Sequence, residues 1–125
     1  MKAHDISAAL AGVRSGKVAT AAEDAAAFPR LASFNSGAVY VGRFSGQSPW
    51  ELHDDGDELL YVLDGEVEIT LLTDKGSVRE IISAGSIFVV PKGMWHRQVA
   101  RPDVTLLAAT PDGSENSFAE DPRQK

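Results

Sequence analysis

A stretch in the middle of the chain places a histidine among several acidic side chains: residues 50–66 read WELHDDGDELLYVLDGE. In a β-strand, side chains two positions apart point to the same side, so Glu51 and His53 would share a face. Glu58 begins the next apolar run, and a chain reversal over residues 54–57 would return its carboxylate towards His53. This group could hold a metal ion, act as an acid/base pair, or form only the charged edge of a hairpin.

A second histidine follows later in the chain, at the end of the segment GSIFVVPKGMWH (85–96). If His96 lies on a strand, Met94 and Gln98 point to the same side as its imidazole. Two imidazoles and two carboxylates converging in a barrel suit a divalent transition metal such as Fe, Mn, Ni, Cu or Zn. Two histidines and one carboxylate also resemble the facial triad of non-haem iron sites. The plainer interpretation, in which both histidines are only hydrogen-bonded or surface strand residues, stays open.

Without a metal, the same groups would form an acid/base cluster. Glu51 and Glu58 close together would not both ionise easily, so the pKa of one carboxyl is expected to rise towards neutrality. Such a pair could support proton transfer in an isomerase or epimerase. The neighbouring Asp54, Asp55 and Asp57 are interpreted as solvated turn residues.

Composition narrows the class of protein. The chain has 125 residues, the size of one domain, and a net charge of -6. It has no cysteine, which excludes disulfides, thiolate catalysis and cysteine-based metal sites. An acidic chain lacks the basic footprint of a nucleic-acid-binding protein and would be repelled by an anionic membrane surface. No apolar run approaches the roughly 20 residues of a membrane span and no signal-peptide core is evident, so we expect a cytoplasmic protein.

The elements that would position these residues are mostly strands. Residues 5–14 suit a short amphipathic helix, and 15–36 a partly helical or extended wrapping segment. Asp64-Gly65 predicts a two-residue hairpin turn, and Lys75-Gly76 a second turn. The expected strands are 38–45, 50–53, 58–63, 66–72, 78–82, 86–90, 94–100 and 103–109. Eight short strands at tight spacing predict an all-β fold, either an antiparallel barrel or a jelly roll.

The chain also resembles the cupin family, whose fold is a double-stranded β-helix or jelly-roll barrel. The first cupin motif is matched by Gly46, Glu51-Leu52-His53, Glu58 and Gly65, and the second by Gly85, Pro91, Gly93 and His96, with Ala100 where asparagine is expected. Both motifs occur in order, with a strand-rich segment between them. The resemblance divides the chain into a helical or irregular N-terminal segment (1–36), a barrel (37–110) and a flexible polar tail (111–125).

The resemblance implies a ligand set. In metal-binding cupins, the ligands are two histidines and a glutamate from the first motif and the histidine of the second, which implies His53, Glu58 and His96 here. Glu51 stands where the family has its first histidine. A glutamate can ligate a metal and would favour harder ions. Glu51 therefore either completes a metal site or marks its loss, and both alternatives stay open.

The function implied by the resemblance is equally broad. We expect a divalent metal in the barrel and a small organic molecule as ligand or substrate, with dioxygenase or isomerase activity as the candidate reactions. The alternatives are a metal-free module that binds or senses a small ligand, and a non-catalytic dimerising barrel. A homodimer is expected because such barrels commonly pair. The candidate pocket-lining residues are Tyr40, Phe44, Met94 and Gln98.

Overall fold

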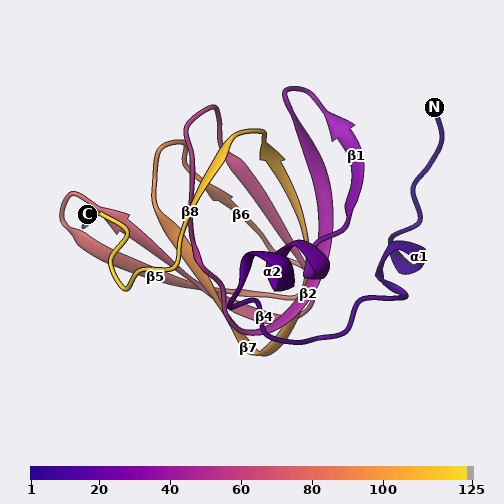
Figure 1. The fold of residues 1–125 in the computed structure, drawn as a ribbon, viewed down its shortest axis with the longest axis horizontal. Coiled ribbons are helices and arrows are strands. Elements are labelled where there is room, and N and C mark those ends of the chain that lie inside the picture. Colours follow the sequence, from indigo (N-terminus) through magenta and orange to yellow (C-terminus); the bar gives the residue numbers. More distant parts are fainter. Residues whose placement is uncertain (124–125) are drawn as a thin grey trace.

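The computed structural model describes residues 1–123, in which two short helices are followed by eight strands (Figure 1). The helices are α1 (Ile6–Leu10) and α2 (Ala21–Ala27). The strands are β1 (Arg30–Phe34), β2 (Gly37–Gln47), β3 (Trp50–His53), β4 (Glu58–Thr73), β5 (Gly76–Ser83), β6 (Ile87–Val90), β7 (His96–Pro111) and β8 (Ser114–Ser117).

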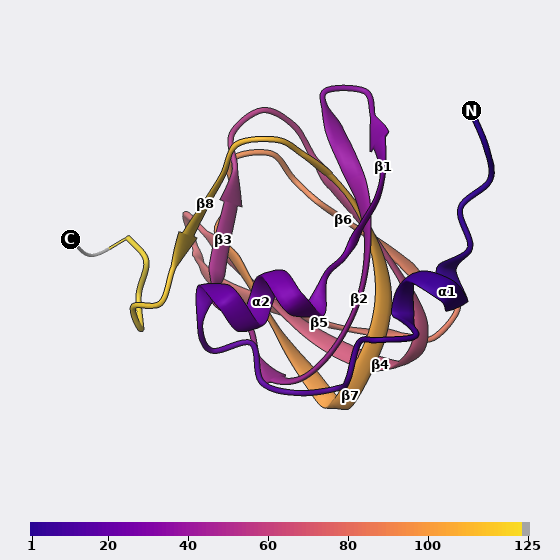
Figure 2. The same ribbon diagram turned by 45° about the vertical axis from the view of Figure 1, so that its right-hand side comes forward.

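β7 is the strand that connects the sheet. It pairs antiparallel with β2, β3 and β4, while β4 also pairs with β5 and β6. β1 and β8 lie at the two ends of the path β1-β2-β7-β3-β8. The sheet curls on itself (Figures 1 and 2), and Phe44, Leu60, Ile69 and Leu106 are fully buried in its core. The predicted all-β jelly-roll barrel with short N-terminal helices is confirmed.

Two pairs of expected strands are each one long strand in the structure. β4 covers both 58–63 and 66–72. β7 covers 103–109 and, from His96 onwards, the expected strand 94–100. The hairpin turn predicted at Asp64-Gly65 is wrong. Gly65 has a φ of 75° and lies at an irregularity in the β4–β7 pairing. A Cβ at this position would collide with the carbonyl oxygen of Asp103 on β7, so glycine lets the two backbones approach closely.

The bend at this irregularity brings distant strand positions together. β7 pairs Ala109 with Leu59 near the start of β4, and His96 with Leu71 near its end. In a straight strand those two positions of β4 would lie roughly 40 Å apart, at about 3.4 Å per residue. Because the long strands bend, Glu58 and His96 meet inside the barrel, with 3.0 Å between Glu58 Oε1 and His96 Nε2.

The N-terminal segment holds both helices and the first strand. α1 is shorter than the expected helix over 5–14 and begins after Asp5, whose side chain accepts a hydrogen bond from the Ala8 N–H. α2 begins with a capping box, in which Thr20 Oγ1 accepts from the Glu23 N–H and the Glu23 carboxylate accepts from the Thr20 N–H. These local signals explain where both helices start.

Aromatic packing fixes α2 against the barrel, where it lies across the front in Figure 2. Phe28, directly after α2, has its ring 5.7 Å from that of Phe44 on β2, measured between ring centres. The Phe28 ring also covers Gly42, where a Cβ would collide with it. The missing side chain at Gly42 therefore makes room for the residue that anchors the helix.

The C-terminal segment differs from the expected flexible tail. β7 extends to Pro111, and β8 pairs with β3 in a register that places Ser114 opposite His53. Trp50 on β3 donates from its indole Nε1 to the carbonyl oxygen of Glu120, at 3.1 Å. β8 therefore covers the free edge of β3, which explains why this polar segment is paired.

Both helices are short, with five residues in α1 and seven in α2. Within residues 1–123, the structure contains no helix with the length and apolar character needed to cross a bilayer. The cytoplasmic location stays a prediction.

Candidate metal centre

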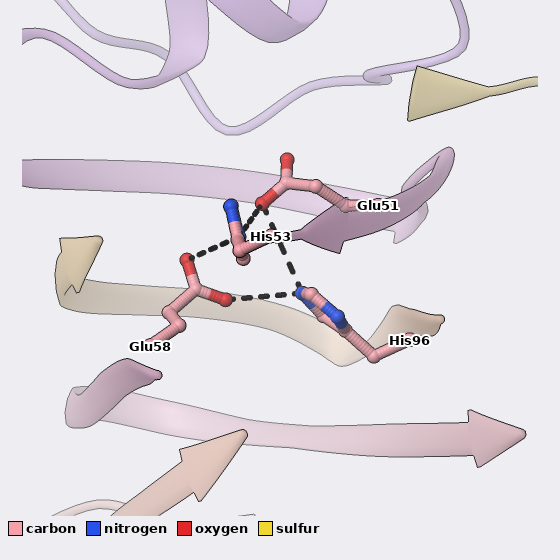
Figure 3. A group of neighbouring side chains, drawn as sticks. All are labelled: Glu51, His53, Glu58 and His96. Carbon is pink, nitrogen blue, oxygen red and sulfur yellow. Dashed lines mark hydrogen bonds and ion pairs between the residues drawn. The ribbon is translucent and has the colours of Figure 1, made fainter. Parts of the chain in front are cut away.

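Four side chains from three strands point towards one another inside the barrel (Figure 3). Glu51 and His53 come from β3, Glu58 from the start of β4 and His96 from the start of β7. One candidate ligand atom from each residue lies within 4.8 Å of all the others. His53, Glu58 and His96 are almost fully buried, whereas Glu51 is half-buried. The structure thus brings together the four residues that the sequence singled out, and their role as ligands stays a prediction.

Each carboxylate lies close to the Nε2 atoms of both imidazoles. Glu58 Oε1 is 3.0 Å from His96 Nε2, and Glu58 Oε2 is 3.6 Å from His53 Nε2. Glu51 Oε1 is 2.7 Å from His53 Nε2 and 3.8 Å from His96 Nε2. The two acids and the two bases therefore surround a common centre.

The other ring nitrogen of each histidine lies near an oxygen atom. His96 Nδ1 is 3.1 Å from the carbonyl oxygen of Met94, which can only accept, so Nδ1 is the donor in this hydrogen bond. His53 Nδ1 is 2.8 Å from Ser114 Oγ, and Thr110 Oγ1 lies 3.2 Å from His53 Nε2. Contacts of this kind at Nδ1 orient metal-binding imidazoles in proteins, whereas the Thr110 hydroxyl lies beside the Nε2 atom of His53 that would bind the ion.

Without a metal, the four residues form a buried network of ion pairs. Burial alone would lower the pKa of His53, but hydrogen bonds to Glu51 and Glu58 outweigh it and raise this pKa to about 10. Burial opposes a charged His96 too, yet the hydrogen bond to Glu58 and the negative charges of Glu58 and Glu51 together outweigh it, and the pKa of His96 is raised. Burial would raise the pKa of Glu58, but hydrogen bonds from both imidazoles lower it to about 2. The metal-free network therefore favours charged histidines and an ionised Glu58.

The expectation that one glutamate of the pair has a raised pKa is wrong for Glu58, because the two imidazoles stabilise its anion. A raised carboxyl pKa is found instead at Asp24 of α2. Burial, followed by the negative charges of Glu51 and Glu58, raises the pKa of Asp24 to about 6. The structure therefore adds a third carboxyl group to the electrostatics of this centre.

The four groups fit a divalent transition metal. An ion would replace the protons on the two Nε2 atoms, and each imidazole would then be a neutral donor. The charges of Glu51 and Glu58 would balance those of the ion. A set of two imidazoles and two carboxylates suits Fe, Mn, Ni, Cu or Zn better than Ca²⁺ or Mg²⁺, which prefer oxygen ligands alone.

A cavity of about 360 Å³ opens beside the centre. Glu51, Glu58 and His96 contribute to its wall, so three of the four candidate ligands face space that a small molecule could enter. Pockets for small organic ligands typically measure about 300–1,000 Å³. The cavity is therefore large enough for a small molecule next to a bound ion.

Three of the four residues expected to line a pocket do so: Tyr40, Phe44 and Gln98. Met94 packs against the hydrophobic core instead. The expectation for Met94 is wrong because β7 begins only at His96, so strand alternation does not extend back to it.

Three further residues at the site had no recognisable signal in the sequence. Asp24 and Ser114 line the cavity from α2 and β8, and Thr110 does so from the end of β7. Asp24 lies in the Ala-rich segment and Ser114 in the polar tail, where no periodic pattern indicated an inward side chain. Their positions follow only from the tertiary structure.

Comparison with known proteins gives a family match. The model of the family described as cupin domain matches residues 44–108, which is just over half of the chain and includes all four candidate ligands. The uncharacterised protein YdbB of Bacillus subtilis (strain 168) is 33% identical over 67 residues, a match that covers 54% of this chain and 57% of YdbB. The chain therefore aligns with little more than half of that relative's length.

Solved structures show the same fold at lower identity. Hydroquinone 1,2-dioxygenase from Sphingomonas sp. TTNP3, with 4-hydroxybenzoate bound, has a TM-score of 0.59 at 20% identity. The match covers 70% of this chain and 66% of the dioxygenase chain. Hydroxypropylphosphonic acid epoxidase from S. wedmorenis, in complex with fosfomycin, has a TM-score of 0.57 at 18% identity. The match covers 66% of this chain and 49% of the epoxidase chain. At these identities the likeness supports the fold alone.

Proposed function

The chain belongs to the cupin domain family, and from this premise we propose that it binds a divalent transition metal and binds or acts on a small organic molecule. The proposed ligands are His53, Glu58 and His96, with Glu51 as the fourth. The observation that carries the proposal is the convergence of four candidate ligand atoms in a group of residues of which three line a cavity of suitable size.

The candidate reactions are a dioxygenation and an isomerisation. A metal ion held by histidines and carboxylates, with open positions, supplies oxygen activation or polarisation of a substrate oxygen. The chain's own groups would orient the substrate against Tyr40 and Phe44, and Asp24 would exchange protons with it near neutral pH, because its pKa is about 6.

A metal-free ligand-binding or sensory module is the second candidate function. It is favoured by the ion-pair network, in which each candidate ligand has a partner of opposite charge without any ion. In this alternative the histidines remain protonated and the cavity only binds its ligand.

Oxygen uptake separates these functions. The protein loaded with Fe(II) is expected to consume oxygen only when a small organic substrate is added, and a His96→Ala variant is expected to show no such uptake. Deuterium exchange at a substrate carbon, followed by NMR, tests isomerisation in the same samples. If a broad panel gives neither uptake nor exchange, the enzyme proposal is wrong and the binding module is favoured.

We also propose that the protein forms a homodimer through the outer face of its sheet. The register places Ile87, Tyr61, Leu107 and Val41 in one row across β6, β4, β7 and β2. Ile87 and Tyr61 are exposed by 64% and 37% of their surface. A second row of Val89, Leu59, Ala109 and Val39 lies beside it on the same face. The two rows hold no charged side chain. Val41 is fully buried, so the part that can pair with a second copy about a twofold axis is the exposed part on β6 and β4.

Replacing an exposed residue of this face with a charged one should separate the subunits. We expect light scattering after size exclusion to show a dimer for the wild type and a monomer for Ile87→Lys, because a buried lysine without a partner is costly. Ile81→Lys is the matched control, since Ile81 is also exposed but lies on β5, outside both rows. A monomeric wild type, or equal behaviour of both variants, would contradict the proposed interface.

A further inference from the structure

Asp24 is the one acidic residue that the helical segment contributes to the cavity wall. It lies on α2, whose position is set by the capping box and by Phe28 over Gly42. Its carboxylate makes no hydrogen bond or ion pair with any of residues 1–123. Asp24 is therefore a partly buried carboxylate, held in place, that lacks a cationic partner.

The charge of the cavity is one-sided. Four carboxylates line it, those of Asp24, Glu51, Glu58 and Asp112, and no lysine or arginine is among the lining residues that the structure describes. An ion of charge +2 would balance Glu51 and Glu58. In the metal-free state, the two protonated histidines would balance them instead. In both states Asp24 and Asp112 remain as negative charges without compensation in the wall.

The rest of the wall indicates the shape of the ligand. Phe28, Tyr40 and Phe44 provide aromatic surface. Gln98 also lines the cavity, and its Oε1 is buried without a hydrogen-bond partner. A cavity of about 150 Å³ already holds a benzene ring, so 360 Å³ accommodates a ring with a substituent. Aromatic surface and unsatisfied acceptors match a ligand with a flat apolar body and a donor group.

We propose that Asp24 determines the specificity of this cavity and selects a small amine, whose apolar body packs on the aromatic wall and whose ammonium group lies against the Asp24 carboxylate. This inference rests on the proposed function in one respect, that the cavity takes a small organic molecule. It excludes simple organic acids as preferred ligands, because a carboxylate would meet Asp24 and Asp112, while the positive charge at the centre is already balanced by Glu51 and Glu58. The raised pKa of Asp24 agrees with this, since a cation would relieve the cost of its buried charge.

Three probes of equal size but different charge test the selectivity: benzylamine, benzyl alcohol and benzoate. Their affinities are measured by calorimetry at a pH well above 6, so that Asp24 is ionised. We expect the wild type to bind benzylamine roughly tenfold more tightly than benzyl alcohol, since a hydrogen bond to a charged group contributes at least this factor. Benzoate should bind most weakly. In Asp24→Asn, which keeps the shape of the side chain, the preference for benzylamine over benzyl alcohol should disappear.

Asp74→Asn is the control, because it removes the same charge from an exposed turn outside the cavity. It should keep the wild-type preference. The inference is overturned if benzylamine does not bind, if benzoate binds as tightly as benzylamine, or if Asp24→Asn keeps the preference. Each titration is run with metal-loaded and with chelator-treated protein, and metal content is measured on the same samples. If the wild type takes up no metal on loading but still prefers benzylamine, the inference is supported while the proposed metal site is wrong. If it takes up metal but shows no preference, the inference alone is wrong.

Discussion

A His53→Ala/His96→Ala variant is expected to contain no metal, whereas the wild type purified without added metal contains an equimolar amount. The two Nε2 atoms are the nitrogen donors of the centre. Without them only the carboxylates of Glu51 and Glu58 remain, and two carboxylates hold a transition metal weakly. Mass-spectrometric elemental analysis of both proteins measures the difference.

The remaining histidine provides the matched control. His4 is exposed at the N-terminal end, so His4→Ala removes an imidazole without changing the centre and should keep the metal. If the wild type takes up no Fe, Mn, Ni, Cu or Zn even after loading, the metal proposal is wrong and the metal-free module is favoured.

Folding of the double variant has to be checked separately, because it leaves the buried Glu58 carboxylate without its cationic partners. Breaking a buried pair in this way costs about 3–5 kcal/mol. Circular dichroism shows whether the variant is folded. Glu51→Gln provides a second test with a smaller risk, since Glu51 is half-buried. If Glu51 is a ligand, this variant binds metal more weakly while its circular dichroism is unchanged, and an unchanged affinity would remove Glu51 from the ligand set.

Local patterns in the sequence predicted much of the centre. Alternation along residues 50–53 correctly placed Glu51 and His53 on one side of β3, because β3 pairs with β8 in an unbroken register. The cupin-like spacing also predicted that Glu58 and His96 would join them. Both predictions depend on residues close in sequence or on a family pattern, and neither required knowledge of how the long strands bend.

Features that depend on distant backbone contacts could not be predicted. Asp64-Gly65 has the composition of a hairpin turn, but the approach of Asp103 from β7 turns the same glycine into a bend within one strand. Ser114 reaches His53 only because β8 fills the edge of β3. Asp24 reaches the cavity only because Phe28 docks on Gly42. In each case a partner more than ten residues away decides the conformation.

The stability of the metal-free protein is expected to fall as pH rises through the neutral range, and metal should reverse this trend. The pKa of His53 is about 10 in the folded protein, against an ordinary value of 6.5, and that of His96 is also raised. A histidine with a raised pKa contributes stability that is fully present below 6.5 and is lost as pH approaches the folded-state value. Glu58 acts in the opposite direction, because its pKa falls from 4.5 to about 2, so its contribution is lost only in acid.

The pH dependence has the opposite direction when an ion replaces the protons on the two imidazoles. Metal requires neutral imidazoles, so binding releases protons and the apparent affinity increases with pH, about tenfold per pH unit for each proton released. The stabilisation that metal adds should therefore grow as pH rises from about 6.5 to about 8.5, over the range in which the chelator-treated protein loses stability. Denaturant unfolding of both forms at several pH values measures the two trends.

Glu58→Gln separates this effect from the titration of the rest of the chain. The variant keeps the shape of the side chain but removes the buried anion that both imidazoles share. Without that anion, His96 loses its hydrogen-bonded partner and burial lowers its pKa, while Glu51 still favours the charged form of His53. The metal-free variant should be less stable than the wild type, with a smaller loss of stability as pH rises above 6.5. A wild type whose metal-free stability is constant or increases over this range would show that the buried histidines are neutral, and that the network of opposite charges in the barrel does not form.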